Sequence, residues 1–330
     1  MGKRSPLIRG EATWSGTRRS ALNESHWRER MRRQTSASML PLSVEPFAFP
    51  CHPAMIPATM TRTAAESPRI ELSSASLTPA SQTTTRRRHR TPLDRGTLRL
   101  SVLIPVYNER HTIEFILDEV HRTRIAKEII VVDDCSTDGT RELLQRLLEE
   151  GRIDRLQLQP MNRGKGAAIR QALSISTGDV VIVQDADLEY DPNDWHELLE
   201  PIVDGRADAC FGSRFLGGPH RVLYFWHSVG NKLLTMYSNM LTNLNLTDME
   251  TCYKAIRGDL ARQVILPKLT TDRFGFEPEV TARLAQARAR IFEVQISYSG
   301  RTYAEGKKIN WRDGIAAFWH ITQFNLNRSR

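Results

Sequence analysis

Apolar residues in the second part of the chain follow two alternating patterns. Short runs of consecutive apolar and largely β-branched residues predict buried strands. Between these runs, apolar residues recur with a helical period, which predicts helices with one buried face. The predicted order is strand 98–106, helix 113–120, strand 128–132, helix 143–148, strand 156–158, helix 164–174 and strand 180–183. Strands that are apolar throughout and alternate with helices indicate an α/β fold, with a mostly parallel central sheet covered by helices on both faces.

Residues 1–96 differ in composition from the rest of the chain. They hold 9 of the 16 prolines, many Ser and Thr residues, and the basic run 86–90. Such a segment cannot bury enough apolar surface to offset the entropy lost on ordering, so we predict that it is disordered. It is either a basic tail attracted to membranes or the product of an over-extended start of the reading frame. The folded domain is predicted to span 97–310, followed by an amphipathic helix at 311–330.

The positive charge of the chain lies in this leading segment. The formal net charge is +8, but residues 1–96 carry 16 Lys and Arg against 7 Asp and Glu, whereas 97–330 carry 30 against 31. The charge therefore does not indicate nucleic-acid binding by the folded part. The four cysteines form no CxxC pair, which argues against a zinc site or a disulfide framework and favours a cytoplasmic location. No apolar run approaches the length of a spanning helix.

Acidic residues follow three of the predicted strands, in the segments 105–109, 133–140 and 185–192. Ligands of parallel sheets bind beyond the carboxyl ends of the strands, so these carboxylates are expected to converge at a binding edge. Helix capping and turn bracing explain part of the pattern, but not Asp185 and Asp187, which flank one alanine after a buried strand. Crowded carboxylates need a cation, and a D-x-D pair suits Mg²⁺ or Mn²⁺ bound to phosphates. The sequence thus predicts a metal-dependent site for a nucleoside diphosphate donor.

A glycine-containing segment, 162–166, opens the predicted helix between these clusters. Glycines at a helix N-terminus let backbone amides approach an anion, and Lys165 adds positive charge. The alternative is that Gly164 and Gly166 only permit a tight turn from strand to helix. The spacing is not that of a Walker A loop.

Together these motifs resemble those of family 2 glycosyltransferases with the GT-A fold, most closely the dolichyl-phosphate mannose and glucose synthases. The similarity covers about 98–308. It implies transfer of a sugar, with inversion, from a donor of the GDP-mannose or UDP-glucose type to a polyprenyl or dolichyl phosphate, assisted by Mg²⁺ or Mn²⁺. One alternative is transfer to a hydroxyl of a polysaccharide or glycolipid, which requires a carboxylate base. Another is a nucleotide-sugar-binding protein without turnover.

The resemblance assigns roles to residues at matching positions. It implies a first nucleotide-binding motif, a base and ribose site, the D-x-D site, a Gly-Ser-Arg segment whose arginine faces phosphate, and a late loop that closes over the donor. With Lys165 added, the candidate nucleotide-sugar-binding residues are Pro105, Tyr107, Glu109, Val132, Asp134, Lys165, Asp185, Ala186, Asp187, Arg214, Arg301 and Lys307. Asp187 and Arg214 are the candidate catalytic residues. The candidate metal ligands are Asp185, Asp187 and Glu189.

The chain departs from the dolichyl-phosphate mannose synthases at two places. Glu189 stands where that branch usually has Gln. On the helix after the Gly-Ser-Arg segment, His227 replaces an expected Arg, with Asn231 one turn later. Further on, Glu277 and Glu279 are either a base for a hydroxyl acceptor or, as we favour, the start of a helix at Pro278.

Two segments are candidates for contact with a membrane surface, where a lipid acceptor would be met. The stretch 313–324 places Ile315, Phe318 and Trp319 on one helical face, with basic residues nearby, as in helices that lie in a membrane interface. The alternative is an ordinary helix packed on the sheet. The second candidate is the aromatic segment 222–226. We therefore expect a cytoplasmic protein that is peripheral at the membrane.

Overall fold

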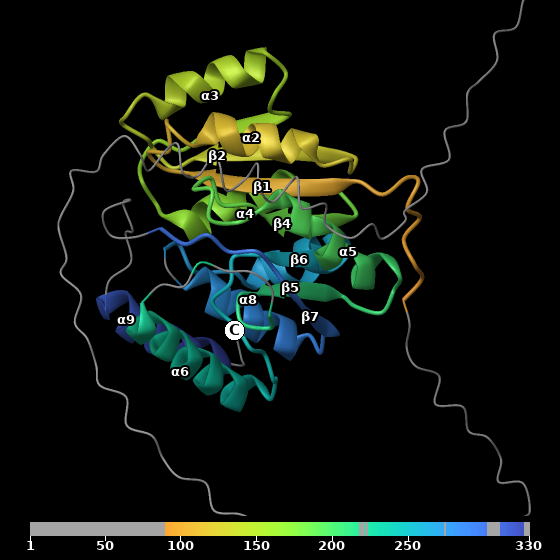
Figure 1. Cartoon of the computed structure of the whole chain (residues 1–330), viewed down its shortest axis with the longest axis vertical. Coiled ribbons are helices and arrows are strands. Elements are labelled where there is room, and N and C mark those ends of the chain that lie inside the picture. Colours follow the sequence, from red (N-terminus) through yellow and green to blue (C-terminus); the bar gives the residue numbers. More distant parts are fainter. Residues whose placement is uncertain (1–89, 218–220, 222–223, 274, 302–310, 327–330) are drawn as a thin grey trace, which may run out of the picture. The chain divides into compact units, whose positions relative to one another are not determined.

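The computed structural model describes residues 90–330 except 218–220, 222–223, 274, 302–310 and 327–330 (Figure 1). The predictions for 1–89 and for Lys307 lie outside these residues. Ordered structure begins before the predicted boundary at residue 97. The Leu93 amide donates to the Val203 carbonyl at 2.8 Å, and Arg90 pairs with Asp208 at 2.6 Å. Residues 90–96 therefore belong to the folded domain.

A seven-stranded sheet forms the centre of the domain, in the order β3-β2-β1-β4-β6-β5-β7. All neighbouring strands run parallel except β6, which is antiparallel to both β4 and β5. The strands are β1 (Leu100–Val106), β2 (Lys127–Asp133), β3 (Arg155–Leu158), β4 (Val180–Val183), β5 (Ala209–Ser213), β6 (Lys254–Arg257) and β7 (Ile291–Gln295). The predicted α/β fold with a mostly parallel sheet is confirmed.

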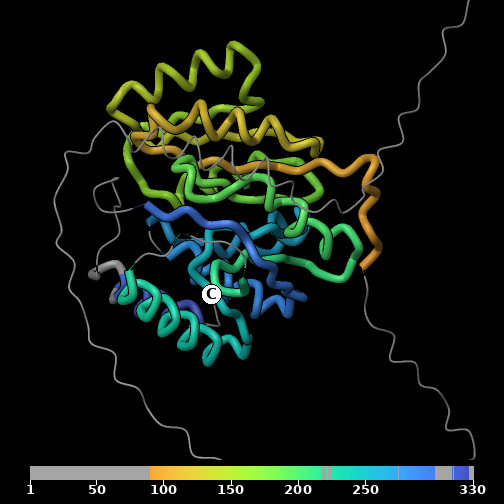
Figure 2. Tube along the Cα trace, viewed as in Figure 1, coloured from red at the N-terminus to blue at the C-terminus, as the bar shows by residue number. Residues whose placement is uncertain are grey.

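Helices connect most of these strands and pack against the sheet (Figures 1 and 2). The longer ones are α2 (Ile113–Arg122), α3 (Thr140–Glu149), α4 (Lys165–Ile175), α5 (Trp195–Val203), α6 (Phe225–Thr242), α8 (Phe276–Gln286) and α9 (Trp311–Leu326). Short helical segments are η1 (Pro192–Asp194), α7 (Gly258–Leu260), η2 (Ala261–Ile265) and η3 (Leu266–Lys268). Helix α4 packs on β1 and β2, whereas α5 packs on the strands at the β7 end. All strands and helices predicted up to β4 are present.

Helix α9 packs against α6 and α8, and Figure 2 shows α6 and α9 side by side. Ile321 and Phe324 of α9 are buried, and Ile321 joins a small core cluster with Leu234 and Met249. Trp319, by contrast, is 68% exposed. One face of the helix therefore belongs to the core, whereas contact of its exposed aromatic side chains with a membrane stays a prediction.

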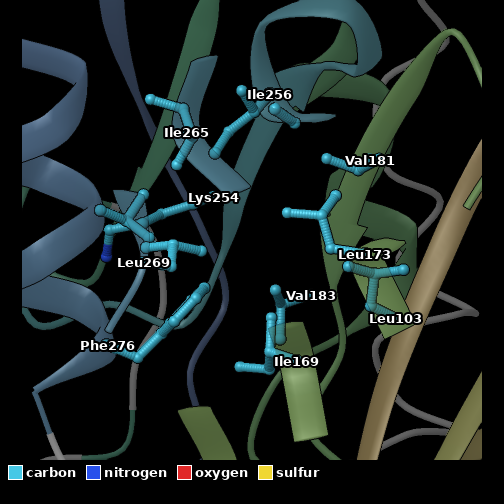
Figure 3. A pocket seen from close by; sticks show the side chains of 12 residues that line it. Leu103, Ile169, Leu173, Val181, Val183, Lys254, Ile256, Ile265, Leu269 and Phe276 are labelled. Carbon is cyan, nitrogen blue, oxygen red and sulfur yellow. The ribbon is translucent and has the colours of Figure 1, made fainter. Parts of the chain in front are cut away.

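A small cavity in the core is a feature of side-chain packing and not a ligand-binding site. It has a volume of about 20 Å³ and an almost wholly apolar lining (Figure 3). Such a space holds about one water molecule at most, so it excludes a substrate. The only charged side chain in its wall is Lys254. The Lys254 ammonium donates to the carbonyls of Met249, at 2.9 Å, and Thr251, and so fixes the loop that precedes β6.

Candidate active site

Asp185 follows β4 and is held by Lys165, the first residue of α4. The Lys165 ammonium lies 2.9 Å from Asp185 Oδ1 and 3.1 Å from Glu277 Oε1. Burial alone would lower the pKa of Lys165, but the charges of Asp185 and Glu277 raise it well above its usual value. Lys165 is therefore a fixed cation among carboxylates. Its predicted contact with a phosphate would have to share the ammonium with these partners.

Asp187 carries the most perturbed carboxylate of the D-x-D pair. Burial, followed by the charges of Glu189 and Asp185, raises the pKa of Asp187 to about 7, although Arg301 opposes the rise. The Arg301 Nη2 atom lies 2.8 Å from Asp187 Oδ2. The charged form of Asp187 is therefore stabilised only in part by Arg301. Two hard oxygen ligands in such a place fit a divalent cation such as Mg²⁺ or Mn²⁺.

The carboxylate of Glu189, the third predicted metal ligand, is hydrogen-bonded to other residues. It accepts hydrogen bonds from the Tyr298 hydroxyl at 2.8 Å, the Arg301 amide at 3.0 Å and Arg301 Nε at 3.3 Å. The backbone turns between the two acidic residues, because Leu188 has a left-handed φ of 65°. Within the described ranges, no group of three or more Asp, Glu, His or Cys side chains is placed to hold a metal. The assignment of Glu189 as a metal ligand beside Asp185 and Asp187 stays a prediction, and it requires Glu189 to exchange these partners for the metal.

Arg214 follows β5 and is oriented by two partners that come later in the chain. Asp248 accepts from Arg214 Nε at 2.6 Å and from Nη2 at 2.8 Å, and the Asn231 side-chain oxygen lies 3.3 Å from Nη2. The guanidinium carbon lies 5.1 Å from the centre of the Tyr298 ring. Tyr298 in turn donates to Glu189. Tyr298 therefore connects Arg214 with Glu189, two residues after Asp187.

Glu250 is a further carboxylate at this edge, in the loop that Lys254 fixes. Its Oε1 atom is inaccessible to solvent and has no hydrogen-bond partner within the described residues. Burial, followed by the charge of Glu277, raises the pKa of Glu250 to about 7, although Lys254 and Arg214 oppose the rise. Sequence reasoning missed Glu250 and Asp248. The acidic pattern at 248–250, which resembles the D-x-D pair, was the signal available.

The residues predicted around the nucleotide divide into exposed and buried groups. Tyr107 is exposed at the end of β1, and Pro105 is half-buried. Glu109 accepts from the Thr112 hydroxyl at 2.7 Å and lies 3.9 Å from Arg301 Nη1. Of these three residues, Glu109 is connected to the D-x-D segment through Arg301.

Three other predicted contacts have structural roles. Asp134 is buried and accepts from the amides of Arg163 at 2.7 Å and Gly164 at 2.8 Å, so it anchors the glycine-containing turn. Val132 is fully buried within β2, and Ala186 is also buried. Because the Val132 side chain lies in the core, its predicted nucleotide contact could involve only the backbone, and it stays a prediction.

The two glutamates of the first turn of α8 differ in their partners. Glu277 pairs with Lys165, as described above. Glu279 is fully buried and accepts from the amides of Thr270 at 3.0 Å and Thr271 at 2.8 Å, so it ties the preceding loop to the helix. The favoured interpretation as a helix start is confirmed, with the helix beginning at Phe276 rather than at Pro278. Glu279 has no access to an acceptor.

Helix α6 presents a row of exposed apolar side chains. Trp226, Leu233, Met236 and Met240 are all exposed, and their spacings of seven, three and four place them on one face. His227, at the position where an Arg was expected, makes a ring contact with Tyr224 instead, 5.3 Å between centres. Among the described helices, none is both long and apolar enough to cross a bilayer. The exposed row is therefore a surface feature.

Comparison with known proteins identifies the family. The model of glycosyl transferase family 2 matches residues 101–265, a segment that holds the D-x-D pair, Arg214 and the loop before β6. The chain belongs to glycosyl transferase family 2. This family 2 chain is 31% identical to polyprenol monophosphomannose synthase of Mycolicibacterium smegmatis over 248 residues, which is 72% of this chain and 92% of that protein. It is 29% identical to undecaprenyl-phosphate mannosyltransferase of Micrococcus luteus over 236 residues, covering 69% and 95% of the two chains.

Solved structures support the fold assignment. Glucosyl-3-phosphoglycerate synthase from Mycobacterium tuberculosis, in complex with Mn²⁺, uridine diphosphate and glucosyl-3-phosphoglycerate, superposes with a TM-score of 0.54 at 18% identity. The match covers 71% of this family 2 chain and 81% of the other. At that identity the likeness concerns the fold alone.

Proposed function

We propose that the chain transfers a hexosyl group from a nucleoside diphosphate sugar to the phosphate of a polyprenyl lipid. The observation that carries this proposal is the link from Arg214 through Tyr298 to the D-x-D segment. This link supports the proposal because it connects a fixed guanidinium, through Tyr298 and Glu189, with the acidic segment expected to bind the metal and the diphosphate. The Arg214 Nη1 atom makes no hydrogen bond within the described residues, although Nε and Nη2 are taken by Asp248. A phosphate oxygen is the natural acceptor for such a donor.

Charge governs the chemistry of this transfer. The departing diphosphate gains negative charge, and fixed cations placed around it stabilise that charge as it develops. Asp185 and Asp187 would hold a divalent ion, which supplies Lewis-acid neutralisation of the diphosphate when it is bound. Arg301 and Arg214 supply further positive charge from the protein. A phosphate monoester has a second pKa of about 6, so the acceptor is largely dianionic at neutral pH and attacks without a protein base.

The names of the relatives support a lipid-phosphate acceptor, since both are polyprenyl-phosphate mannose enzymes. One observation favours a second function. Glu250 has two properties of a general base. Its pKa is near neutrality, and its Oε1 atom has no hydrogen-bond partner in the part of the chain that the structure describes. A hydroxyl acceptor would need such a base. The second candidate is therefore transfer to a hydroxyl.

One assay separates the two functions. Purified protein with Mn²⁺ or Mg²⁺ is given a panel of labelled GDP- and UDP-sugars, with either a polyprenyl phosphate or the corresponding free polyprenol as acceptor. We expect product from the phosphate, and Glu250→Gln should keep that activity within about tenfold. Product from the alcohol alone, together with a loss of about 100-fold or more in Glu250→Gln, would establish the hydroxyl function instead.

Membrane contact is the remaining part of this proposal. The exposed face of α6 and the neighbouring Trp319 form an apolar surface of the kind that binds membrane interfaces. We propose a peripheral location on the cytoplasmic side. Met236→Ser and Trp226→Ser should weaken sedimentation with anionic liposomes, whereas Leu148→Ser, which changes an exposed leucine on α3, should not. Equal sedimentation of all three variants and the unchanged protein would contradict this placement.

A further inference from the structure

Arg301 lies where three carboxylates meet. Its guanidinium contacts Asp187 at 2.8 Å, Glu189 at 3.3 Å and Glu109 at 3.9 Å. The same arginine donates its backbone amide to Glu189 at 3.0 Å. Its side chain therefore offsets part of the negative charge of this acidic edge.

Glu189 is the residue that holds this arrangement in place. One of its oxygens accepts from Arg301, and the other accepts from the Tyr298 hydroxyl. The amide of Ser299 also donates to the Glu189 carbonyl at 3.0 Å. The backbone and the side chain of Glu189 thus form hydrogen bonds with three residues of the segment 298–301. Both carboxylate oxygens already accept hydrogen bonds, unlike those of a carboxylate that is free to bind a metal.

We propose that Glu189 is a positioning residue that holds the Arg301 guanidinium in contact with Asp187. In the absence of a diphosphate, this guanidinium occupies the carboxylate that would otherwise bind the metal. This inference rests on the proposed function for the identity of the diphosphate. A guanidinium and a divalent cation repel each other when they share one carboxylate, so Arg301 weakens metal binding to the protein alone. A diphosphate offers Arg301 other oxygens, with charge-assisted hydrogen bonds. Metal and nucleotide therefore bind with positive coupling, which acts equally in both directions.

The first test measures Mn²⁺ affinity without any reaction. Free Mn²⁺ is followed by electron paramagnetic resonance as it is titrated into the intact protein, with and without GDP or UDP. For the unchanged protein we expect at least tenfold tighter binding when a nucleotide is present. Arg301→Gln should bind Mn²⁺ at least fivefold tighter than the unchanged protein in the absence of nucleotide. Unchanged nucleotide-free affinity in Arg301→Gln would overturn the inference.

The second test separates a positioning role for Glu189 from a ligand role. Glu189→Gln is made in the Arg301→Gln background, where no arginine is left to position. A residue that acts through Arg301 should then weaken nucleotide-free Mn²⁺ binding no more than Glu109→Gln does in the same background, because each change removes one negative charge from this acidic edge. A greater loss would mean that Glu189 coordinates the metal itself. The cycle therefore decides between the two roles.

A further variant guards against effects on folding. Tyr298→Phe keeps every charge and removes one hydrogen bond to Glu189, so it should tighten nucleotide-free Mn²⁺ binding in the same direction as Arg301→Gln. If Arg301→Gln fails to fold, weaker or unchanged binding in Tyr298→Phe overturns the inference. Because these titrations use no sugar or lipid, they stay informative if transfer activity differs from the proposal. Absence of Mn²⁺ binding by the unchanged protein even with nucleotide would instead count against the metal site of the proposed function.

Discussion

Replacing Glu250 by Gln should stabilise the protein at alkaline pH. In the folded chain, burial and the neighbouring Glu277 raise the pKa of Glu250 from 4.5 to about 7. A difference of one in pKa is worth about 1.36 kcal/mol, so ionised Glu250 lowers the free energy of unfolding by about 3 kcal/mol. Partial exposure of the rest of the side chain makes this an upper limit. Gln has nearly the same shape and carries no charge, so it removes this penalty.

The sign of the pH dependence follows from proton linkage. Between pH 4.5 and about 7 the folded protein holds a proton on Glu250 that the unfolded chain has lost, so stability falls as the pH rises through this window. The advantage of Glu250→Gln should therefore be small at pH 5 and should reach up to about 3 kcal/mol at pH 8.

Urea unfolding at several pH values measures this advantage directly. Taking the difference between variant and unchanged protein at each pH cancels the titration of groups that do not interact with Glu250. Glu149→Gln, which changes an exposed glutamate at the end of α3, is the control and should show no such trend. An advantage that is equal at pH 5 and pH 8, or a variant that is less stable at pH 8, would refute the reasoning. A confirmed gain would mean that the protein keeps a costly carboxylate at its candidate active site.

Three further predictions follow from the described contacts. A chain that begins at residue 97 should melt several degrees below one that begins at Arg90, because the ion pair with Asp208 is lost; equal melting temperatures in scanning fluorimetry would contradict this. Asp187→Asn should abolish Mn²⁺-dependent nucleotide binding in calorimetry without lowering the melting temperature, and retained binding would exclude Asp187 as a ligand. Ile321→Ala should cost about 2–4 kcal/mol in urea unfolding, because it empties a fully buried site, whereas Trp319→Ser should cost less than about 0.5 kcal/mol while weakening liposome binding. The reverse order of stabilities would place Trp319 in the core.

The first half of the fold could be predicted because its signals are local. The strand at 180–183 matches β4 in both bounds, and the helix predicted from residue 164 begins at Lys165. Apolar runs and helical periodicity report burial within a few residues of chain, which is the range over which these elements form. Strand β7 gave no such signal. Its five positions are all half-buried or exposed at the edge of the sheet farthest from β3, and its sequence mixes polar and apolar residues.

The candidate site was only partly accessible from the sequence. The residue types at Asp185, Asp187 and Arg214 carried a recognisable chemistry, so they were identified. Their partners were not, because partner choice depends on distant parts of the chain. Arg301 and Asp187 are 114 residues apart in the chain. The strands that precede them, β7 and β4, are separated in the sheet by β5 and β6. The role of Glu189 could not be predicted, since its spacing fits a metal ligand while its bonds go to the segment after β7.

The parallel pairing of β5 with β7 has a consequence for how the protein is made. A chain leaves the ribosome from its N-terminus, and domains fold as their parts become available. Strand β5 ends at Ser213, but its partner begins only at Ile291, so that edge of the sheet waits for nearly eighty further residues. A nascent chain that already holds the D-x-D pair still lacks Arg301 and the strand that leads to it. The acidic edge is therefore completed late in synthesis, and until then its carboxylates are open to whatever cations the surrounding solution supplies.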